Sequence, residues 1–595
     1  MTSICAALLE GHSPLAAMLA NVAAPGTPSD QHISPDGISL GFVQPAGGRN
    51  SGLFSDVASG WTWVGNARLD YREELLLALH LPATISDAAL AYQAFLRLEL
   101  QCLTRLHGDW QFAAWNSRTR RLIVARDPFG SAGLYYHHTP GRFACAGHID
   151  GVLAVPTVPR EVNWESLALS LSILANQSAD TGFRGIHRLI AGHALEVTAA
   201  SCRQIRYWDL HEPVEPLRGS DDDLQLQFED TFRRAVDSRV RSVLKPASTL
   251  SGGLDSGAVT ATAARLLAGS GQRLGAFTSV PAHRPVGKFD PFRFLDEGPA
   301  AAAVAQWHPN IDHHLVSAAN RCPVAAIQRT VVLTGAARAT ANAVWLLTIF
   351  EESQAYGHHA IFNGQGGNAT LSWHGPPTWR NILKAKLQQL TGRSFRRRGA
   401  WQQFCLLRPS TITAQGLAPL LFDAEDQYRQ ARDFRRFSLQ ATLNFSGFLW
   451  TSLAGAYGLQ ALDPTVDPRF IRLCQALPPR LFVGREPARR AMEGLLPDVV
   501  RLNRRRGLQC ADFVQRLQAN QPAAMQALER FGRQTTVAEV LDVPRLRRAI
   551  ADACSATDPR TRQSLTTQIC CGLAGGFFLE HATASPQNLV SKSAA

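Results

Sequence analysis

The stretch that most constrains the fold of this chain is SGGLDS at residues 251–256. It follows a short apolar lead-in and precedes a run of small residues that can continue as a helix. A strand, a glycine-rich turn and a helix N-terminus form an anion site, because free backbone N–H groups and the positive end of the helix dipole meet there. Gly252 and Gly253 let the backbone approach a phosphate and take φ > 0 where needed. Asp255 would repel a phosphate without an intervening cation, so the string indicates Mg²⁺.

The same string resembles the pyrophosphate-binding loop of ATP pyrophosphatases, which split ATP into AMP and pyrophosphate and activate a carboxylate as an adenylate. The hydroxyls of Ser251 and Ser256 add donors to the loop. A Walker A loop would need a lysine followed by Ser or Thr after its last glycine, and no such lysine follows here. The resemblance therefore implies adenylation chemistry with ATP and Mg²⁺.

Length and composition set outer limits. A chain of 595 residues is too long for one core, so two or more domains are expected. The net charge of +12 suggests an acidic partner without identifying it. The 11 cysteines show no C-x-x-C spacing, which predicts a reducing cytosol and a cytoplasmic protein. No uncharged apolar run reaches membrane-spanning length, so no membrane partner is expected.

Residues 1–210 are predicted to form an α+β domain of two packed sheets. Short apolar runs such as 60–66 and 121–126 alternate with turn residues. Between them the apolar spacing of Asp87 to Leu103 predicts one helix, with Ser86 as its cap.

Residues 221–595 are predicted to form an α/β domain with a doubly wound parallel sheet. The acidic triplet Asp221–Asp223 opens an amphipathic helix, and helix charge is favoured there over a metal site. Strands and helices then alternate, which places ligands at the carboxyl ends of the strands. The predicted strands are 274–278, 311–316 and 360–362, and the predicted helices are 296–307 and 342–356.

Several strings in the N-terminal part resemble the glutamine-hydrolysing domain of class B asparagine synthetases. They are LHGDWQFA at 106–113, ARDPFG at 125–130, LYY at 134–136 and the F-x-G-I pattern that begins at Phe183. With SGGLDS in the expected place, the resemblance spans most of the chain. It implies an Ntn-type glutaminase-like sandwich followed by an ATP-pyrophosphatase domain.

Two departures imply that this domain does not hydrolyse glutamine. The family uses an N-terminal cysteine whose own α-amine is the base, whereas position 2 is Thr and Cys5 has no free α-amine. The family's N-G-E segment reads Asn66-Ala67-Arg68, and a side chain at Ala67 crowds a site built on glycine. A Thr2 nucleophile remains the alternative.

The segment NGQGGNA at 363–369 stands where the family has G-E-G-x-D-E. Gln365 and Asn368 replace two carboxylates, of which one is a catalytic Glu and the other a Mg²⁺ ligand. An amide oxygen still ligates Mg²⁺, but an amide cannot act as a base at neutral pH. Asparagine is then disfavoured as the product, and a plain glycine-rich turn is the structural alternative.

Four further segments supply candidate substrate or catalytic residues. Asp296-Glu297 precede a helix, where capping is the default interpretation and contact with ATP or a substrate amine the alternative. Residues 457–467 resemble the family's E-x-R-x-P-F-L-D and keep its Pro and Asp. Counting from Pro497 places Arg505 where the family's phosphate-neutralising lysine stands, with Arg504 or Arg506 left open. The basic segment 380–408 is predicted to be a surface loop, with contact to an acidic peptide or to nucleic acid as the alternative.

The resemblance and the fold together assign the following residues. Those assigned to ATP are Ser251, Gly252, Gly253, Leu254, Asp255, Ser256, Phe277, Thr278, Gly364, Gly366 and Gly367. Those assigned to catalysis are Asp255, Arg505 and Gln365, and those assigned to the metal are Asp255 and Asn368. Those assigned to the substrate are Asp296, Glu297, Trp373, Asp463 and Asp467.

A degenerate glutaminase fused to an ATP pyrophosphatase is the pattern of β-lactam synthetases and of lasso-peptide cyclases. The strings GQGGNATLSW at 364–373 and RRGLQ at 505–509 look like those of lasso-peptide cyclases. The resemblance implies adenylation of an Asp or Glu side chain of a leader-cleaved precursor peptide, followed by attack of the peptide's α-amine. It also implies a leader peptidase and a leader-recognition protein as pathway partners.

Three alternatives stay open: a small-molecule or β-lactam ligase, an ammonia-dependent asparagine synthetase, and an RNA-modifying adenylating protein. The last would account for the net charge of +12. Nucleic acid is nevertheless disfavoured, because neither paired reactive cysteines nor a dedicated RNA-binding domain is visible.

Overall fold

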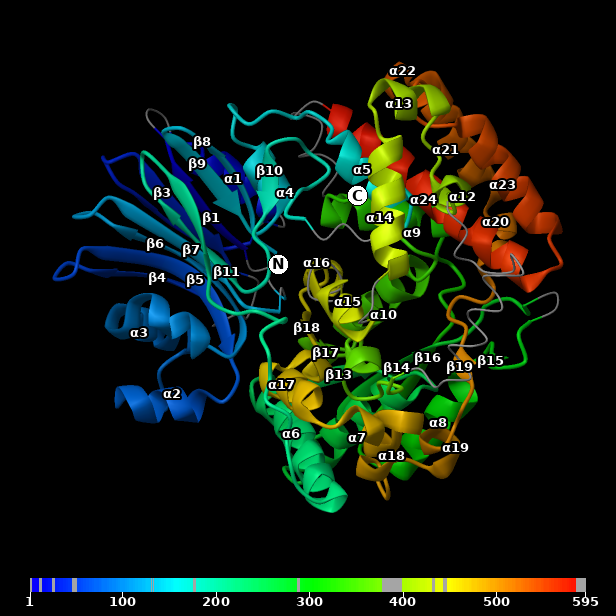
Figure 1. Ribbon diagram of the computed structural model, residues 1–595, viewed down its shortest axis with the longest axis horizontal. Helices are drawn as coiled ribbons and strands as arrows, with labels where there is room; N and C mark the ends of the chain where they lie inside the picture. The colour runs from blue at the N-terminus through cyan, green and yellow to red at the C-terminus, as the bar shows by residue number, and fades with distance from the viewer. Residues whose placement is uncertain are drawn as a thin grey trace.

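A computed structural model describes residues 3–9, 13–23, 27–44, 51–129, 131, 133–174, 178–285, 289–376, 399–430, 434–441 and 447–584. Two layered parts lie side by side, with the N-terminal sheets on one flank and the α/β part with its C-terminal helices on the other (Figure 1). Thr2 and most of the basic segment 380–408 lie outside the described residues.

The N-terminal part is built on two antiparallel sheets of six strands each. The first has the order β10-β8-β9-β1-β3-β2, with β1 Ser3–Leu8, β2 Ser29–Ile33, β3 Ile38–Val43, β8 Tyr135–Thr139, β9 Arg142–Ala146 and β10 Ile186–Arg188. The second has the order β12-β11-β7-β6-β5-β4, with β4 Ser51–Asp56, β5 Trp61–Leu69, β6 Gly108–Asn116, β7 Arg121–Arg126, β11 His193–Val197 and β12 Cys202–Arg206. The predicted two-sheet α+β domain is confirmed.

Helices cover the outer faces of both sheets, and an apolar core fills the space between them. Leu40 and Phe42 of the first sheet belong to one buried cluster with Val64 and Trp115 of the second. The helices of this part are α1 Leu15–Val22, α2 Arg72–Leu79, α3 Asp87–Leu98, α4 Ile149–Leu153 and α5 Trp164–Leu171. Ser86 caps α3 as predicted, since its Oγ accepts the Ala89 N–H at 3.3 Å. The prediction of one helix to Leu103 was wrong: the α-helix ends at Leu98, because Glu99 has φ 45°, and a 3₁₀ segment, η1 Glu99–Thr104, follows.

The second part contains a five-stranded parallel sheet in the order β16-β14-β13-β17-β18. Its strands are β13 Pro246–Thr249, β14 Leu274–Ser279, β16 Ile311–Val316, β17 Ala360–Phe362 and β18 Gln460–Leu462. The strand order reverses beside β13, which places the SGGLDS string at the switch point where doubly wound sheets bind their ligands.

Helices pack on both faces of this sheet, as the alternation of strands and helices predicted. One face carries α6 Asp221–Arg241, α7 Leu254–Ala268, α8 Gly298–Trp307, α17 Pro468–Ala476, α18 Glu486–Ala491 and α19 Asp498–Arg501. The other carries α9 Pro323–Thr334, α10 Ala343–Ala355 and α16 Gly447–Gly455. The Asp221 triplet is a helix start: Ser220 caps α6, and Arg480 and Arg490 pair with Asp221 and Asp222.

A helical region completes the chain and reaches back to the N-terminal part. It contains α12 Trp401–Phe404, α13 Pro409–Ala414, α14 Ala418–Gln430, α15 Phe434–Ala441, α20 Phe513–Ala519, α21 Gln521–Arg533, α22 Thr535–Ala538, α23 Val543–Ser555 and α24 Pro559–Thr583. Phe578 of α24 lies against Phe183, with 5.3 Å between ring centroids, in a core cluster that also contains Cys5 and Leu15. Among the described residues no helix is long and apolar enough to cross a membrane.

Buried charges also join the two parts. Arg68 of β5 donates to Asp70 at 2.6 Å and to Asp109 at 2.8 Å, and its side chain is 1% exposed. Arg239 of α6, in the second part, contacts both Asp70 at 3.2 Å and Asp467 at 3.1 Å. We call these five residues the interdomain ion network. Each of its two buried guanidinium groups lies between two carboxylates, which compensates their charge.

Candidate active site

A pocket of about 230 Å³ opens at the carboxyl ends of the central strands. Residues from six separate stretches of the chain line it, which explains why no single motif defines it. They are Thr249, Leu250, Ser251, Gly253, Asp255, Ser256, Phe277, Ser279, Glu297, Trp345, Ile349, Gly364, Gln365, Asn368 and Gln509. Most of the predicted nucleotide loop therefore faces one cavity together with Gln365 and Asn368.

The SGGLDS loop turns from β13 into α7 as predicted. The Oγ atoms of Ser251 and Ser256 lie 2.6 Å apart, and the Gly253 N–H donates to Ser251 Oγ at 3.2 Å. Neither glycine of the loop has a positive φ. Gly252 is required for space instead, because a Cβ there would lie 2.9 Å from the Phe294 ring. The loop carries the free N–H groups of a helix N-terminus at the pocket, which is the geometry that binds phosphate.

Asp255 is the charged group of this loop, and its Oδ1 is buried without a hydrogen-bond partner among the described residues. Burial raises the pKa of Asp255 to about 6, against the pull of Ser372 and Arg485. Two glycines hold the space around it: a Cβ at Gly367 would lie 2.3 Å from Oδ1, and one at Gly364 would lie 3.1 Å from the Asp255 backbone. A carboxylate oxygen left without a partner beside a phosphate loop fits a Mg²⁺ ligand.

The two amides that replace family carboxylates both lie in the pocket. Gln365 and Asn368 are exposed. They lie on the loop after β17, which also contains Gly364 and Gly367. The described residues contain no cluster of three or more His, Cys, Asp or Glu that could hold a metal ion. Mg²⁺ held here would therefore take Asp255, the Asn368 amide and oxygens of the nucleotide itself.

Asp296 and Glu297 have separate roles. Asp296 caps α8, since its Oδ1 accepts the Gly298 N–H at 2.8 Å. The default capping interpretation is wrong for Glu297, whose side chain makes no capping hydrogen bond and lines the pocket instead. Glu297 is 8% exposed, and burial together with the charge of Asp296 raises its pKa to about 7.

The arginine triplet enters the site one residue later than counting predicted. Arg505 points away and donates to the Arg293 carbonyl at 2.9 Å. Arg506 donates to His374 Nε2 at 2.6 Å and acts electrostatically on Asp255. Arg485, which the sequence did not single out, reaches the same nitrogen at 2.6 Å. Burial and the two guanidinium groups lower the pKa of His374 to about 4, so at neutral pH it accepts hydrogen bonds without adding charge.

Several other predicted residues lie behind the pocket. Asp467 is fully buried: it caps α17 and contacts Arg239, so the assignment to substrate is wrong. Trp373 packs on Phe482 at 5.1 Å and is not among the residues that line the pocket. Leu254 belongs to the core, and Thr278 Oγ1 donates to the Leu250 carbonyl at 2.7 Å, so both support the site from within.

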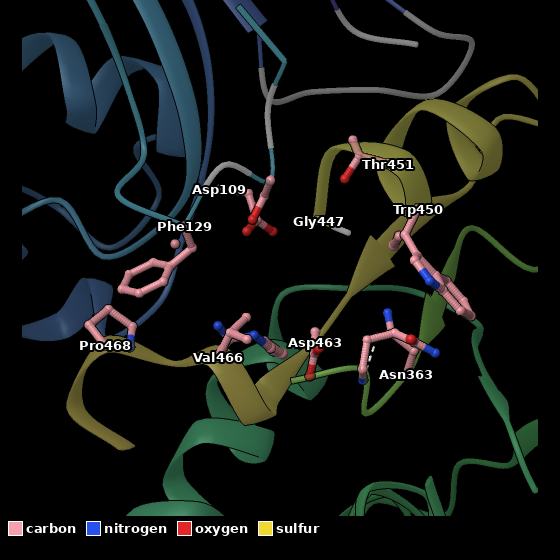
Figure 2. Close-up of a pocket in the computed structure, with 14 residues that line it drawn as sticks. Asp109, Phe129, Asn363, Gly447, Trp450, Thr451, Asp463, Val466 and Pro468 are labelled. Carbon is pink, nitrogen blue, oxygen red and sulfur yellow. Dashed lines mark hydrogen bonds between the residues drawn. The ribbon is translucent and has the colours of Figure 1, made fainter. Parts of the chain in front are cut away.

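A second pocket lies between the two parts of the molecule (Figure 2). Asp109 and Phe129 of the N-terminal part face Asp463 and Asn363 of the sheet domain across it. Asp463 is held by the Gly366 N–H at 2.9 Å and by the Thr465 N–H at 2.9 Å. Gln365 lines both pockets, so they adjoin at that side chain.

The residues that replace the family's N-G-E segment are buried and do not face an open site. Ala67 and Arg68 are each 1% exposed on β5, and both guanidinium partners of Arg68 are carboxylates of this chain. A buried, fully paired arginine leaves no free charge there for a ligand.

The fold and the pocket define a molecule of two parts, a two-sheet N-terminal part and a parallel-sheet part with a phosphate-binding loop. Residues 227–573 match the asparagine synthase family, and residues 68–208 match the glutamine amidotransferase domain. The chain belongs to the asparagine synthase family.

Relatives include asparagine synthetase [glutamine-hydrolyzing] 3 of Bacillus subtilis, which is 28% identical over 230 residues, or 38% of this chain and 37% of the relative. The amidase chyE of Penicillium rubens is 27% identical over 309 residues, or 50% of this chain and 44% of the relative. The amidase chry2 of Gibberella zeae is 27% identical over 299 residues, or 48% of this chain and 42% of the relative. The chain thus spans less than half the length of each of these relatives.

Proposed function

We propose that this protein is an ATP-dependent, AMP-forming macrolactam synthetase of lasso-peptide type. It adenylates an Asp or Glu side chain of a leader-cleaved peptide and closes an isopeptide bond with the peptide's α-amine. The observation that carries the proposal is the Asp255 carboxylate, unpaired at Oδ1 beside a phosphate loop, in a pocket where Gln365 replaces a family base. Membership of the asparagine synthase family supports the amide-forming half of this reaction.

Each step can be assigned to residues of the chain. The backbone N–H groups at the start of α7 and the hydroxyls of Ser251 and Ser256 bind the pyrophosphate end of ATP. Asp255 and Asn368 would hold Mg²⁺, which would supply positive charge to the phosphates. The substrate carboxylate attacks the α-phosphate. Arg506 and Arg485 stabilise the negative charge that develops at the phosphate. AMP then leaves as the amine attacks the acyl carbon.

The amine that attacks the adenylate is the α-amine of the same peptide. Arg68 is buried and paired with Asp70 and Asp109, so position 68 offers no free charge to glutamine, and we infer that this part supplies no ammonia. An α-amine has an unperturbed pKa of about 7.7–8.0 and is partly neutral near pH 7, whereas a lysine side chain at about 10.4 is not. The α-amine therefore needs the least help from the site.

The test supplies the enzyme, ATP and Mg²⁺ with the synthetic, leader-cleaved peptide encoded beside its gene. The expected product has lost one water, with AMP formed in equal amount. N-acetylation of the peptide should allow adenylation but block ring closure. An acetylated peptide that still loses water would exclude the α-amine, and pyrophosphate exchange with a free β-amino acid alone would identify a small-molecule ligase.

A parallel assay tests the N-terminal part. Incubation with glutamine, ATP and Mg²⁺ should release no glutamate above a heat-killed control. Glutamate release that disappears in a Thr2→Ala variant would show instead that Thr2 acts as a nucleophile.

A further inference from the structure

We propose that Glu297 is the general base that takes the proton from the attacking amine. The inference rests on the proposed function and assigns the role that Gln365 cannot perform. An amide has no basic oxygen at neutral pH, so the family's carboxylate chemistry at position 365 has to come from another group or be absent. Among the residues that line the pocket, only Asp255 and Glu297 carry carboxylates.

The position of Glu297 fits this role. It stands at the N-terminus of α8 and shares the pocket with the phosphate loop, Gln365 and Asn368. Glu297 is 8% exposed, and its carboxylate makes no hydrogen bond or ion pair within the described part of the chain. A buried carboxylate without a partner is unfavourable for folding, and such groups are typical of sites that bind a ligand or carry out a reaction.

The chain also makes room for this carboxylate. A Cβ at Gly507 would lie 2.0 Å from Glu297 Oε1, so only glycine fits at that position. Gly507 lies on β19 Arg506–Gly507, which pairs in parallel with β15 Arg293–Phe294. The short two-stranded sheet therefore places Arg506 directly before the glycine that leaves room for the Glu297 carboxylate.

The charged groups around Glu297 set its proton affinity. Asp296 precedes it on its own element, Arg293 and Arg506 belong to the adjoining strands, and Asp255 lies on the same pocket. Arg293 is engaged with the Gly507 carbonyl at 3.1 Å, and Arg506 with His374. Burial first and Asp296 second raise the pKa of Glu297 to about 7. A base with a pKa near the working pH combines a useful deprotonated fraction with adequate proton affinity.

The step balances without any added reactant. The amine nitrogen forms a bond to the acyl carbon of the adenylate while its N–H proton passes to the Glu297 carboxylate. The bond between the acyl carbon and the phosphate oxygen breaks, and AMP leaves with that electron pair. Glu297 then releases its proton to water.

The experiment separates adenylation from ring closure in Glu297→Gln and in a control, Asp296→Asn. Adenylation is measured as pyrophosphate–ATP exchange with the N-acetylated peptide, and closure as cyclic product from the free peptide. Glu297→Gln should exchange as the wild type does but close the ring about 10²–10⁴-fold more slowly. Asp296→Asn leaves the Glu297 carboxylate in place and only lowers its pKa, so it should slow closure by less than about threefold.

A pH profile gives a readout that a structural role would not move. Below about pH 7, a plot of the logarithm of the wild-type rate of ring closure against pH should have a slope of two, because both the amine and Glu297 become protonated. Glu297→Gln should fall with a slope of one. Hydroxylamine, which is neutral at this pH, should intercept the adenylate at equal rates in both proteins.

Failure of the proposed function would be seen in the wild-type protein, whereas failure of the role of Glu297 would be seen only in the Glu297→Gln variant. If peptide cyclisation is not the function, the wild type itself will show no exchange with the acetylated peptide. If Glu297 is not the base, the wild type will close the ring and Glu297→Gln will close it equally fast, or will lose exchange and closure to the same extent.

Discussion

The interdomain ion network and the nucleotide pocket handle buried charge in opposite ways. In the network, Arg68 lies between Asp70 and Asp109, and Arg239 lies between Asp70 and Asp467. Burial alone would raise the pKa of Asp70, yet Arg239 and Arg68 outweigh it and the pKa is lowered. In the pocket, burial prevails, and the pKa values of Asp255 and Glu297 are raised.

This difference separates a region kept for architecture from a region kept for chemistry. Paired charges satisfy one another and hold two domains in register, but they leave nothing for a ligand. Unpaired carboxylates destabilise the free protein, and the binding of a metal, a nucleotide or a proton relieves them. The comparison therefore predicts that the loss of a charge has opposite effects on stability in the two regions.

The largest effect is expected from Arg68→Met. The substitution removes one guanidinium, which leaves Asp109 without its partner and Asp70 with Arg239 alone at the interface. The free energy of unfolding should fall by about 3–5 kcal/mol, measured by urea denaturation. Arg273→Met is the matched control, because it breaks an exposed pair with Asp312 and should change nothing measurable. Equal results for the two variants would mean that the network does not hold the domains together.

The next effect is on rate. Asp255→Asn removes the carboxylate that faces the phosphate loop, so AMP formation should fall roughly a hundredfold to a thousandfold, or about 3–4 kcal/mol in activation free energy. Single-turnover AMP release at saturating Mg²⁺ is the measurement. Asn368→Asp should be tolerated better than Asn368→Ala, because only Ala removes the oxygen. Near wild-type release from Asp255→Asn would exclude it as the metal ligand.

The same pocket substitutions should stabilise the free protein. A carboxyl whose folded pKa lies above its unfolded value contributes stability at low pH and loses it as the pH rises through the folded pKa. Above about pH 7, Asp255→Asn should therefore raise the free energy of unfolding by about 1–2 kcal/mol, since Asp255 is partly exposed. Glu297→Gln should raise it by about 2–3 kcal/mol, since Glu297 is buried. Below about pH 4 the gain should vanish. A thermal melt of each variant at both pH values measures this, and a loss of stability at neutral pH would contradict it.

The smallest effect distinguishes two neighbouring arginines. Arg506→Ala should slow AMP formation about tenfold, or about 1.4 kcal/mol, because it removes a charge that acts on Asp255. Arg505→Ala, whose side chain binds the Arg293 carbonyl, should leave the rate unchanged. If steady-state assays show instead that Arg505→Ala slows the reaction and Arg506→Ala does not, Arg505 is the catalytic arginine, as the sequence predicted.

The sequence predicted what local patterns determine. The strand 311–316, the start of α6 and the turn at 251–256 lie where the strand–helix alternation, the acidic triplet and the two glycines predicted them. The helix from Asp87 ran too long in the prediction, because no Gly or Pro marks the break at Glu99. The helices after residue 400 and the strand pair β15–β19 were not predicted, since their order comes from tertiary packing.

The site was harder to predict, because its parts meet only in the fold. Glu297, Arg485 and Arg506 lie far apart in sequence and carry no common motif. The misassigned Asp467 did have a local signal: an Asp directly before Pro468 is typical of a helix N-cap, which is its role here.

The packing of α24 on the N-terminal part has a consequence for how the protein is made. Phe183 finds its partner Phe578 only when the last helix exists, and Gly182 is shaped to receive that same ring, since a Cβ there would lie 2.4 Å from it. At about 5–20 residues per second, a ribosome needs roughly 20–80 s to travel from one phenylalanine to the other. For that interval the nascent N-terminal domain carries an uncovered apolar face, and its folding is completed only at the end of translation.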